Sequence, residues 1–200
     1  MSDVSDQALL REERAAADDK TQFGFWLYIM TDCVLFASLF ATYAVLHNNT
    51  FGGPPARELF NLHAVLAETL FLLTSSFTCG LAMLAVRRQS KQQVIFWLAV
   101  TFLLGAAFLG LELNEFHQLA SEGNSWRRSG FLSAFFTLVS THGLHITIGL
   151  SWIAAMIVKI YRSGLGRHTV RRLTMLSLFW HFLDIVWIFI FTIVYMLGAV

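Results

Sequence analysis

Charged residues, cysteine and proline are all scarce in this 200-residue chain, and each shortage excludes a class of protein. Charged residues make up only 14%, where soluble domains average roughly 25%, so the composition excludes an ordinary soluble domain. No basic stripe of the kind that nucleic acid requires is present, so no nucleic-acid partner is expected. The two cysteines, Cys33 and Cys79, lie in apolar runs without CxxC spacing, which predicts buried thiols rather than a disulfide or a metal pair.

What the chain has instead is long apolar runs, with 56% hydrophobic residues and 19 phenylalanines. A helix needs about 20 mostly apolar residues to cross a bilayer, and five segments meet that requirement. The sequence predicts an all-α integral membrane protein with a tail at 1–22 and a five-helix transmembrane domain at 23–200. The expected spans are about 23–46, 64–86, 94–113, 131–158 and 173–198.

Lysine and arginine are distributed unequally between the two sides of the predicted spans. Eleven lie in the N-terminal tail, the second connection and the fourth connection, whereas three, Arg57, Arg127 and Arg128, lie on the opposite side. Cytoplasmic segments carry the Lys/Arg excess, so the N-terminus is predicted to be cytoplasmic and the C-terminus periplasmic. The tail at 1–22 mixes acidic and basic residues without an apolar core, which is unlike a signal peptide.

The predicted spans contain ionisable residues, which are costly in hydrocarbon and are expected to face other helices or a neighbouring subunit. At 1.5 Å per residue they sort into two depths. The inner-to-central set is Asp32, His142, His145, His181 and Asp184, and the outer set is Glu68, Glu112, Glu115 and His117. His181 and Asp184 lie one turn apart, and we expect them to satisfy each other or partners on the first and fourth spans.

Three roles are open for these polar residues. They form interhelical hydrogen bonds that fix packing, they handle protons through Asp32 or Glu68, or His142, His145 and His181 ligate haem or a metal. No HExxH or GxSxG motif is present, so no catalytic residue is assigned.

Small and aromatic residues predict how the helices pack. The stretches TSSFTCG and GAAFLG, the latter with Ala106 and Gly110 four residues apart, predict close approach between helices. The last span carries more Phe and Trp than five helices can bury. We therefore expect lipid or subunit contacts, assigned to Trp26, Trp180 and Trp187.

Several separated motifs carry a resemblance to a known family. They are FGFWLYIMTDCVLFASLFATYAVL in the first span, NEFH at 114–117, SGFLSAFFTLVSTHGLH leading into STHGLHITIG at 140–149, and LFWHFLDIVWIFIF at 178–191. In these stretches the chain resembles subunit III of the haem–copper respiratory oxidases, in the short five-span form of bacterial cytochrome bo-type ubiquinol oxidases. Relatives that oxidise cytochrome c usually have seven spans and a Glu where this chain has Asp32.

The resemblance implies a non-catalytic subunit without metal or cofactor of its own. In this family haem b, an o-type haem, copper and the proton pump belong to subunit I, which reduces oxygen with electrons from ubiquinol. Subunit III stabilises subunit I, binds phospholipids and supports proton uptake. The implied partners are subunits I and II and a small subunit IV, in the bacterial inner membrane.

Overall fold

The computed structural model describes residues 2–47, 49, 62–121 and 129–196, and every regular element in these ranges is a helix. The elements are α1 (Ser2–Leu46), α3 (Leu62–Arg87), α4 (Lys91–Ser121), α5 (Gly130–Ser163), α6 (Arg167–Ile190) and the π-helical segment η1 (Phe191–Met196). Five stretches within them are long and apolar enough to cross a membrane: Lys20–Leu46, Ala64–Arg87, Lys91–Ser121, Gly130–Ser163 and Arg167–Met196. The predicted fold class, all-α with five spans, is confirmed.

The helices extend beyond the apolar cores from which the spans were predicted. α1 begins at Ser2, so it runs through the expected tail, and α4 continues past Leu113 to Ser121. Residues 197–198 of the last predicted span, and the arginines Arg57, Arg127 and Arg128 that count toward the orientation, lie outside the described residues. The orientation of the termini therefore stays a prediction.

The chain divides into two units, Met1–Ser38 and Leu39–Val200. The first unit is the greater part of α1 and carries Asp32 and Trp26. The second unit begins with the last turns of α1. There the Tyr43 hydroxyl donates to the Val194 carbonyl across 3.4 Å, and the Tyr43 ring lies 6.1 Å from that of Phe131.

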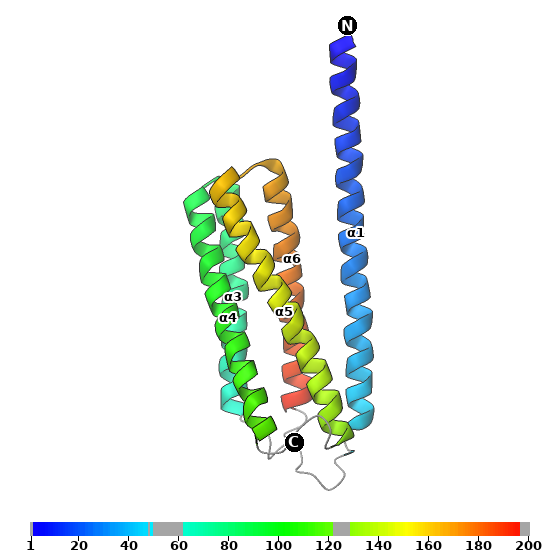
Figure 1. The fold of residues 1–200 in the computed structure, drawn as a ribbon, viewed down its shortest axis with the longest axis vertical. Helices are drawn as coiled ribbons and strands as arrows, with labels where there is room; N and C mark the ends of the chain where they lie inside the picture. Colours follow the sequence, from blue (N-terminus) through cyan, green and yellow to red (C-terminus); the bar gives the residue numbers. More distant parts are fainter. Residues whose placement is uncertain (1, 48, 50–61, 122–128, 197–200) are drawn as a thin grey trace. The chain divides into compact units, whose positions relative to one another are not determined.

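Four helices of the second unit form a ring in which each contacts its two neighbours. α3 packs against α4 and α6, and α5 packs against the same two helices. Consecutive helices run antiparallel, so the α3–α4 and α5–α6 turns lie at one end of the ring, while α4 ends and α5 begins at the other (Figure 1). This up-down arrangement follows from the two short connections, since a short connection leaves adjacent helices antiparallel.

The turns and helix ends show how the chain reverses direction. α3 ends at a turn in which Gln89 has a positive φ of 54°, and α5 ends at Gly164 with φ of 72°. The Gly164 N–H donates to the Ile160 carbonyl at 2.9 Å, which is the usual way a left-handed residue closes a helix. At the start of α5, the Ser129 hydroxyl accepts a hydrogen bond from the Leu132 N–H at 3.2 Å.

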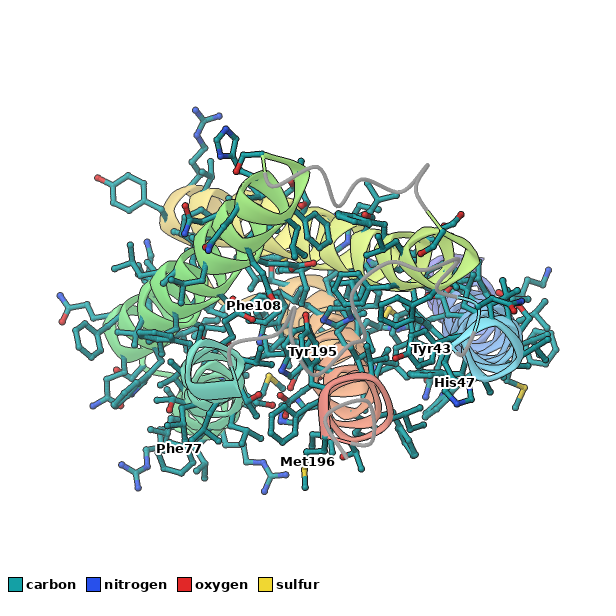
Figure 2. All side chains as sticks on the ribbon, turned by 90° about the horizontal axis from the view of Figure 1, so that it is seen from below. Tyr43, His47, Phe77, Phe108, Tyr195 and Met196 are labelled. Carbon is teal, nitrogen blue, oxygen red and sulfur yellow. The ribbon has the colours of Figure 1, made fainter. Side chains whose placement is uncertain are left out.

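Large aromatic side chains fill the interior of the ring. Phe108 and Tyr195 point inward between the helices, whereas Phe77 and Met196 point away from them (Figure 2). The rings of Phe108 and Trp187 meet edge to face, 4.6 Å between centroids, and Phe135 meets Tyr195 in the same way at 5.9 Å. Edge-to-face pairs of this kind stabilise a core beyond the burial of their area alone.

Candidate functional site

The first feature of the interior is a series of hydroxyl groups on α3 that bond to neighbouring helices. Trp187 Nε1 donates to Thr69 Oγ1 at 3.1 Å, and Trp180 Nε1 donates to Ser75 Oγ at 2.8 Å. Thr78 and Thr101 of α4 share a hydrogen bond of 2.8 Å. Each bond satisfies a polar group that lacks water around it, and together the bonds hold α3 against α4 and α6.

Trp180 contacts all three of the other helices in the ring. A Cβ at Gly105 of α4 would lie 2.9 Å from the indole, and a Cβ at Gly149 of α5 would also lie 2.9 Å from it. The indole is 1% exposed, and its N–H bonds to α3. The Trp180 indole therefore fits between α4 and α5 only because positions 105 and 149 are both glycine.

These observations correct the role predicted for two tryptophans. Trp180 and Trp187 are 1% and 0% exposed and are enclosed by their own chain, so they do not supply a lipid or subunit contact. The exposed apolar side chains of α6 are instead Leu178, Ile185, Ile188 and Phe189. Trp26, in the first unit, is exposed.

Acidic side chains from α3 and α4 converge at the end of the ring that is farther from the α3–α4 turn. We call the three glutamates there, together with the tyrosine that bonds to one of them, the carboxyl cluster: Glu68, Glu112, Glu115 and Tyr195. Glu68 of α3 and Glu112 of α4 are each 2% exposed, and Glu115 is half-buried one turn beyond Glu112. Glu112 has Glu68 and Glu115 as its electrostatic neighbours. The Tyr195 hydroxyl donates to Glu115 Oε2 at 3.3 Å.

The π-helical segment places Tyr195 in this cluster. In η1 the backbone is wound more loosely than in α6, which changes which side chains face the interior. Val194 and Tyr195 are both fully buried there among the four helices, whereas Met196 is 51% exposed. Helical periodicity in the sequence assumes a regular α-helix and contains no sign of the π-helical segment. The sequence therefore offered no reason to place Tyr195 among the buried polar residues.

His142 lies beside the carboxyl cluster rather than in a separate inner set. Its ring stacks on Trp187 at 5.4 Å between centroids, and the edge of Phe108 meets it at 6.1 Å. The next residue, Gly143, lies so close to Glu112 that a Cβ would be 2.9 Å from Glu112 Oε1. His142 and the three glutamates of the outer set are thus one cluster, joined across α3, α4, α5 and η1.

The two other histidines within the predicted inner set lie elsewhere. His145 is 9% exposed, with Nδ1 at 2.7 Å from the Thr141 carbonyl, and His181 is exposed, with Nδ1 at 2.7 Å from the Ser177 carbonyl. His117 of the predicted outer set is exposed on α4. In the ranges that the structure describes, no group of three or more His, Cys, Asp or Glu is placed to hold a metal ion.

Asp184 has a neighbour on a helix that the sequence analysis did not expect. It is 8% exposed, and its electrostatic neighbours are Ser76 of α3 and His181 of its own helix. We expected Asp184 to be satisfied by His181 or by partners on the first and fourth spans, and His181 is indeed one of its neighbours. Ser76, in the stretch TSSFTCG, lies near Asp184 because α3 and α6 are adjacent in the ring, an adjacency that helical periodicity alone does not define.

Chemically, the carboxyl cluster is suited to holding protons between helices. Glu68, Glu112 and Glu115 form no ion pair with lysine or arginine within the described part of the chain, and the Oε2 atoms of Glu68 and Glu112 accept no hydrogen bond there. A protonated carboxyl donates one hydrogen bond and accepts others, whereas two adjacent carboxylates repel each other. The arrangement supplies groups that can share protons between helices.

The fold and this interior define a class: a multi-pass α-helical membrane protein whose buried polar residues connect its helices. Residues 1–199 match the family model described as cytochrome c oxidase subunit III. The chain therefore belongs to the cytochrome c oxidase subunit III family, and it is a non-catalytic subunit of a haem–copper oxidase complex. The predicted family is confirmed.

Curated relatives cover nearly the whole chain. It is 59% identical over 179 residues to cytochrome bo(3) ubiquinol oxidase subunit 3 of Pseudomonas aeruginosa, covering 90% of this chain and 86% of the relative. It is 57% identical to the protein of the same name from Pseudomonas putida, again over 179 residues that cover 90% of this chain and 86% of the relative. It is also 45% identical over 190 residues to cytochrome c oxidase subunit 3 of a Bacillus species (strain PS3), covering 94% of this chain and 92% of that one.

Proposed function

We propose that this chain is subunit III of a proton-pumping ubiquinol oxidase in the inner membrane of a bacterium. The observation that carries the proposal is the identity of 59% and 57%, over 90% of this chain, to two ubiquinol oxidase subunits. The complex then takes electrons from ubiquinol and reduces oxygen to water. Haem b, an o-type haem and copper are held by subunit I, and the further partners are subunit II and a small subunit IV.

Within that complex, the proposed work of this chain is to stabilise subunit I and to bind phospholipids. The second unit presents large apolar side chains outward on every helix of the ring, among them Phe77, Leu103, Leu144 and Phe189. Such faces need either acyl chains or another subunit against them, and both are available to a membrane complex. The interior hydrogen bonds of Trp180 and Trp187 give those faces a rigid support.

The third part of the proposal is support of proton uptake. Asp32 lies within the membrane-spanning part of α1, and an intramembrane carboxyl is a proton-handling group by default. Under the proposed orientation, with the N-terminus cytoplasmic, the carboxyl cluster lies nearer the periplasm.

Purification of the complex tests the proposed donor. The complex that contains this chain should oxidise ubiquinol rapidly, should not oxidise ferrocytochrome c, and should carry all its haem in other chains. Rapid oxidation of ferrocytochrome c without ubiquinol oxidation would contradict the proposal.

Removal of the chain tests its role. A complex lacking this chain should begin turnover at nearly the normal rate and then lose activity sooner than the intact complex, because subunit I has lost its support. An equal lifetime with and without the chain would contradict a stabilising role. An Asp32→Asn variant should show slower proton uptake with normal assembly; unchanged uptake would exclude Asp32.

A further inference from the structure

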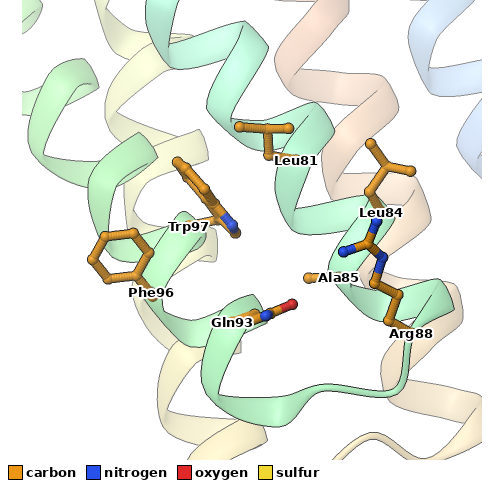
Figure 3. Close-up of a pocket in the computed structure, with 7 residues that line it drawn as sticks. All are labelled: Leu81, Leu84, Ala85, Arg88, Gln93, Phe96 and Trp97. Carbon is orange, nitrogen blue, oxygen red and sulfur yellow. The ribbon is translucent and has the colours of Figure 1, made fainter.

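The described cations of the four-helix ring lie at the end opposite the carboxyl cluster. Every lysine and arginine that the structure describes in α3, α4, α5 and α6 lies at or near the α3–α4 and α5–α6 turns: Arg87, Arg88, Lys91, Lys159, Arg162, Arg167, Arg171 and Arg172. Arg88, for example, borders a surface groove beside Leu84 at the α3–α4 turn (Figure 3). Lys91, at the start of α4, is about 30 Å from Glu112 along the helix at 1.5 Å per residue. Within the described residues, no cationic side chain of the ring therefore reaches the carboxyl cluster.

Burial makes negative charge on the inner glutamates costly. Glu68 and Glu112 are each 2% exposed, and their Oε2 atoms make no hydrogen bond within the described part of the chain. A buried carboxylate is neutralised by a cationic side chain, by a metal ion or by a proton. The described residues contain no group of three or more His, Cys, Asp or Glu arranged to hold a metal ion. The geometry therefore favours protons as the neutralising species.

The elements packed against these glutamates supply neutral or titratable side chains. From η1, the Tyr195 hydroxyl donates to Glu115 Oε2 at 3.3 Å. From α5, His142 lies beside Glu112 and has His145 as its electrostatic neighbour. From α6, Trp187 stacks on His142, and its N–H is already donated to a threonine hydroxyl of α3. These neighbours leave the carboxyl groups to share protons with one another.

The members of the carboxyl cluster differ in their access to water. Glu68 and Glu112 are almost fully buried, whereas Glu115, one turn beyond Glu112 toward the end of α4, is half-buried. Glu68 lies four residues inside the span Ala64–Arg87, about 6 Å at 1.5 Å per residue. The carboxyl cluster is therefore close to the membrane surface at its end of the ring, and Glu115 lies between the inner glutamates and that surface.

We propose that the carboxyl cluster is a proton-exchange site, in which Glu68 and Glu112 each hold a proton and Glu115 transfers protons between them and water. A hydronium ion gives its proton to the Glu115 carboxylate and becomes water. Glu115 then passes the proton to whichever inner carboxylate has lost its own, and release follows the same steps in reverse. This inference goes beyond the proposed function, because it depends neither on the electron donor nor on Asp32.

Infrared spectroscopy of the purified oxidase complex tests where the protons are bound, because a protonated carboxyl group has a C=O stretching band that a carboxylate lacks. Glu68→Gln and Glu112→Gln should each remove the band of one carboxyl group at neutral pH. Glu112→Asp is the matched control, since it keeps a carboxyl group and should keep a band. Unchanged spectra in both glutamine variants would show that Glu68 and Glu112 are ionised, and would overturn the proposal.

Transfer of the complex to heavy water tests the role of Glu115. The bands of Glu68 and Glu112 should shift within minutes as deuterons replace their protons. Subtraction of the spectrum of a complex without this chain identifies the chain's bands even where a variant fails to assemble. Glu115→Gln should keep both bands and slow their shift about tenfold, as expected for loss of a proton-transferring group. His117→Gln removes an exposed titratable group two residues along α4, and should leave the rate unchanged.

Two results in heavy water would overturn the proposal. Bands that do not shift in the unmodified complex would show that the protons are sealed in the core. Shifts of equal rate in Glu115→Gln and in the unmodified complex would show that exchange does not pass through Glu115. Neither result depends on which substrate the complex oxidises, so failure of this proposal is distinguishable from failure of the proposed function.

Discussion

Trp180 Nε1 donates a hydrogen bond to Ser75 Oγ across 2.8 Å. This bond connects α6 with α3 through two residues that are 105 positions apart in the chain. The same indole lies against Gly105 and Gly149 with no room for a further methyl group at either position. One side chain of α6 thus sets its distance to α3, α4 and α5 together.

Replacement of Gly149 by alanine should destabilise the ring. The new methyl group would lie 2.9 Å from the Trp180 ring, and overpacking of a tight core costs about 1–3 kcal/mol. The temperature at which this chain is lost from the purified complex measures the effect. Gly110→Ala is the matched control on an exposed face with nothing within 4 Å, and it should leave that temperature unchanged or higher. Equal behaviour of the two variants would contradict the packing described.

A double-mutant cycle should detect the bond between Trp180 and Ser75. Trp180→Phe and Ser75→Ala each remove one partner, so the double variant should be more stable than the sum of the single losses predicts. We expect a coupling of about 0.5–1.5 kcal/mol, the usual net contribution of a buried hydrogen bond. Additive losses would mean that the indole stabilises the core by packing alone.

Asp184 should tolerate an amide but not a methyl group. Asp184→Asn keeps a polar side chain of the same size beside Ser76 and His181, whereas Asp184→Ala leaves the buried Ser76 hydroxyl without a polar group beside it. An unsatisfied buried group costs about 1–3 kcal/mol, so the alanine variant should reduce the yield of assembled complex. Normal yield of Asp184→Ala, measured beside the asparagine variant, would remove the structural role of this pair.

Tyr195 should stabilise the folded chain through its hydroxyl group as well as through its aromatic ring. Tyr195→Phe loses the 3.3 Å bond to Glu115 and should destabilise the chain by about 0.5–1.5 kcal/mol. Tyr161→Phe is the control, because that residue is 74% exposed. Thermal loss of the chain from the complex again provides the measurement, and an effect no larger than that of the control would exclude the bond.

Glycine at position 89 should stabilise the α3–α4 turn. Gln89 has a φ of 54°, where a side chain costs about 1–2 kcal/mol and glycine costs little. Gln89→Gly should therefore raise the stability of the chain, even after loss of the 3.3 Å bond from Gln89 Nε2 to the Val86 carbonyl. Gln92→Gly, inside α4, should lower it. A loss in both variants would contradict the turn geometry.

The spans were predictable because each depends on local composition alone. A run of about 20 apolar residues requires a helix wherever it meets a bilayer, since the backbone has no other partner there. The family was predictable from separated motifs such as STHGLHITIG. Burial of Asp184 also followed from its position inside an apolar span.

Helix neighbours could not be predicted in the same way. Helical spacing shows which residues share a face, but it does not show which helix that face meets. For that reason the α3 neighbour of Asp184 was not predicted, and Trp180 and Trp187 were assigned to lipid or subunit contacts. Close approach was predicted for the stretch GAAFLG, which begins with Gly105, but the side chain that Gly105 contacts, Trp180, was not predicted.

The amino-acid sequence by itself determined that this chain has five helices long and apolar enough to cross a membrane, with polar side chains inside them. Only the tertiary structure decided which of them meet: the ring order puts α3 beside α6, and the π-helical turn carries Tyr195 to Glu115. The physical reason is that hydrophobicity acts on each helix separately, whereas packing and hydrogen bonding act between helices that are distant in sequence.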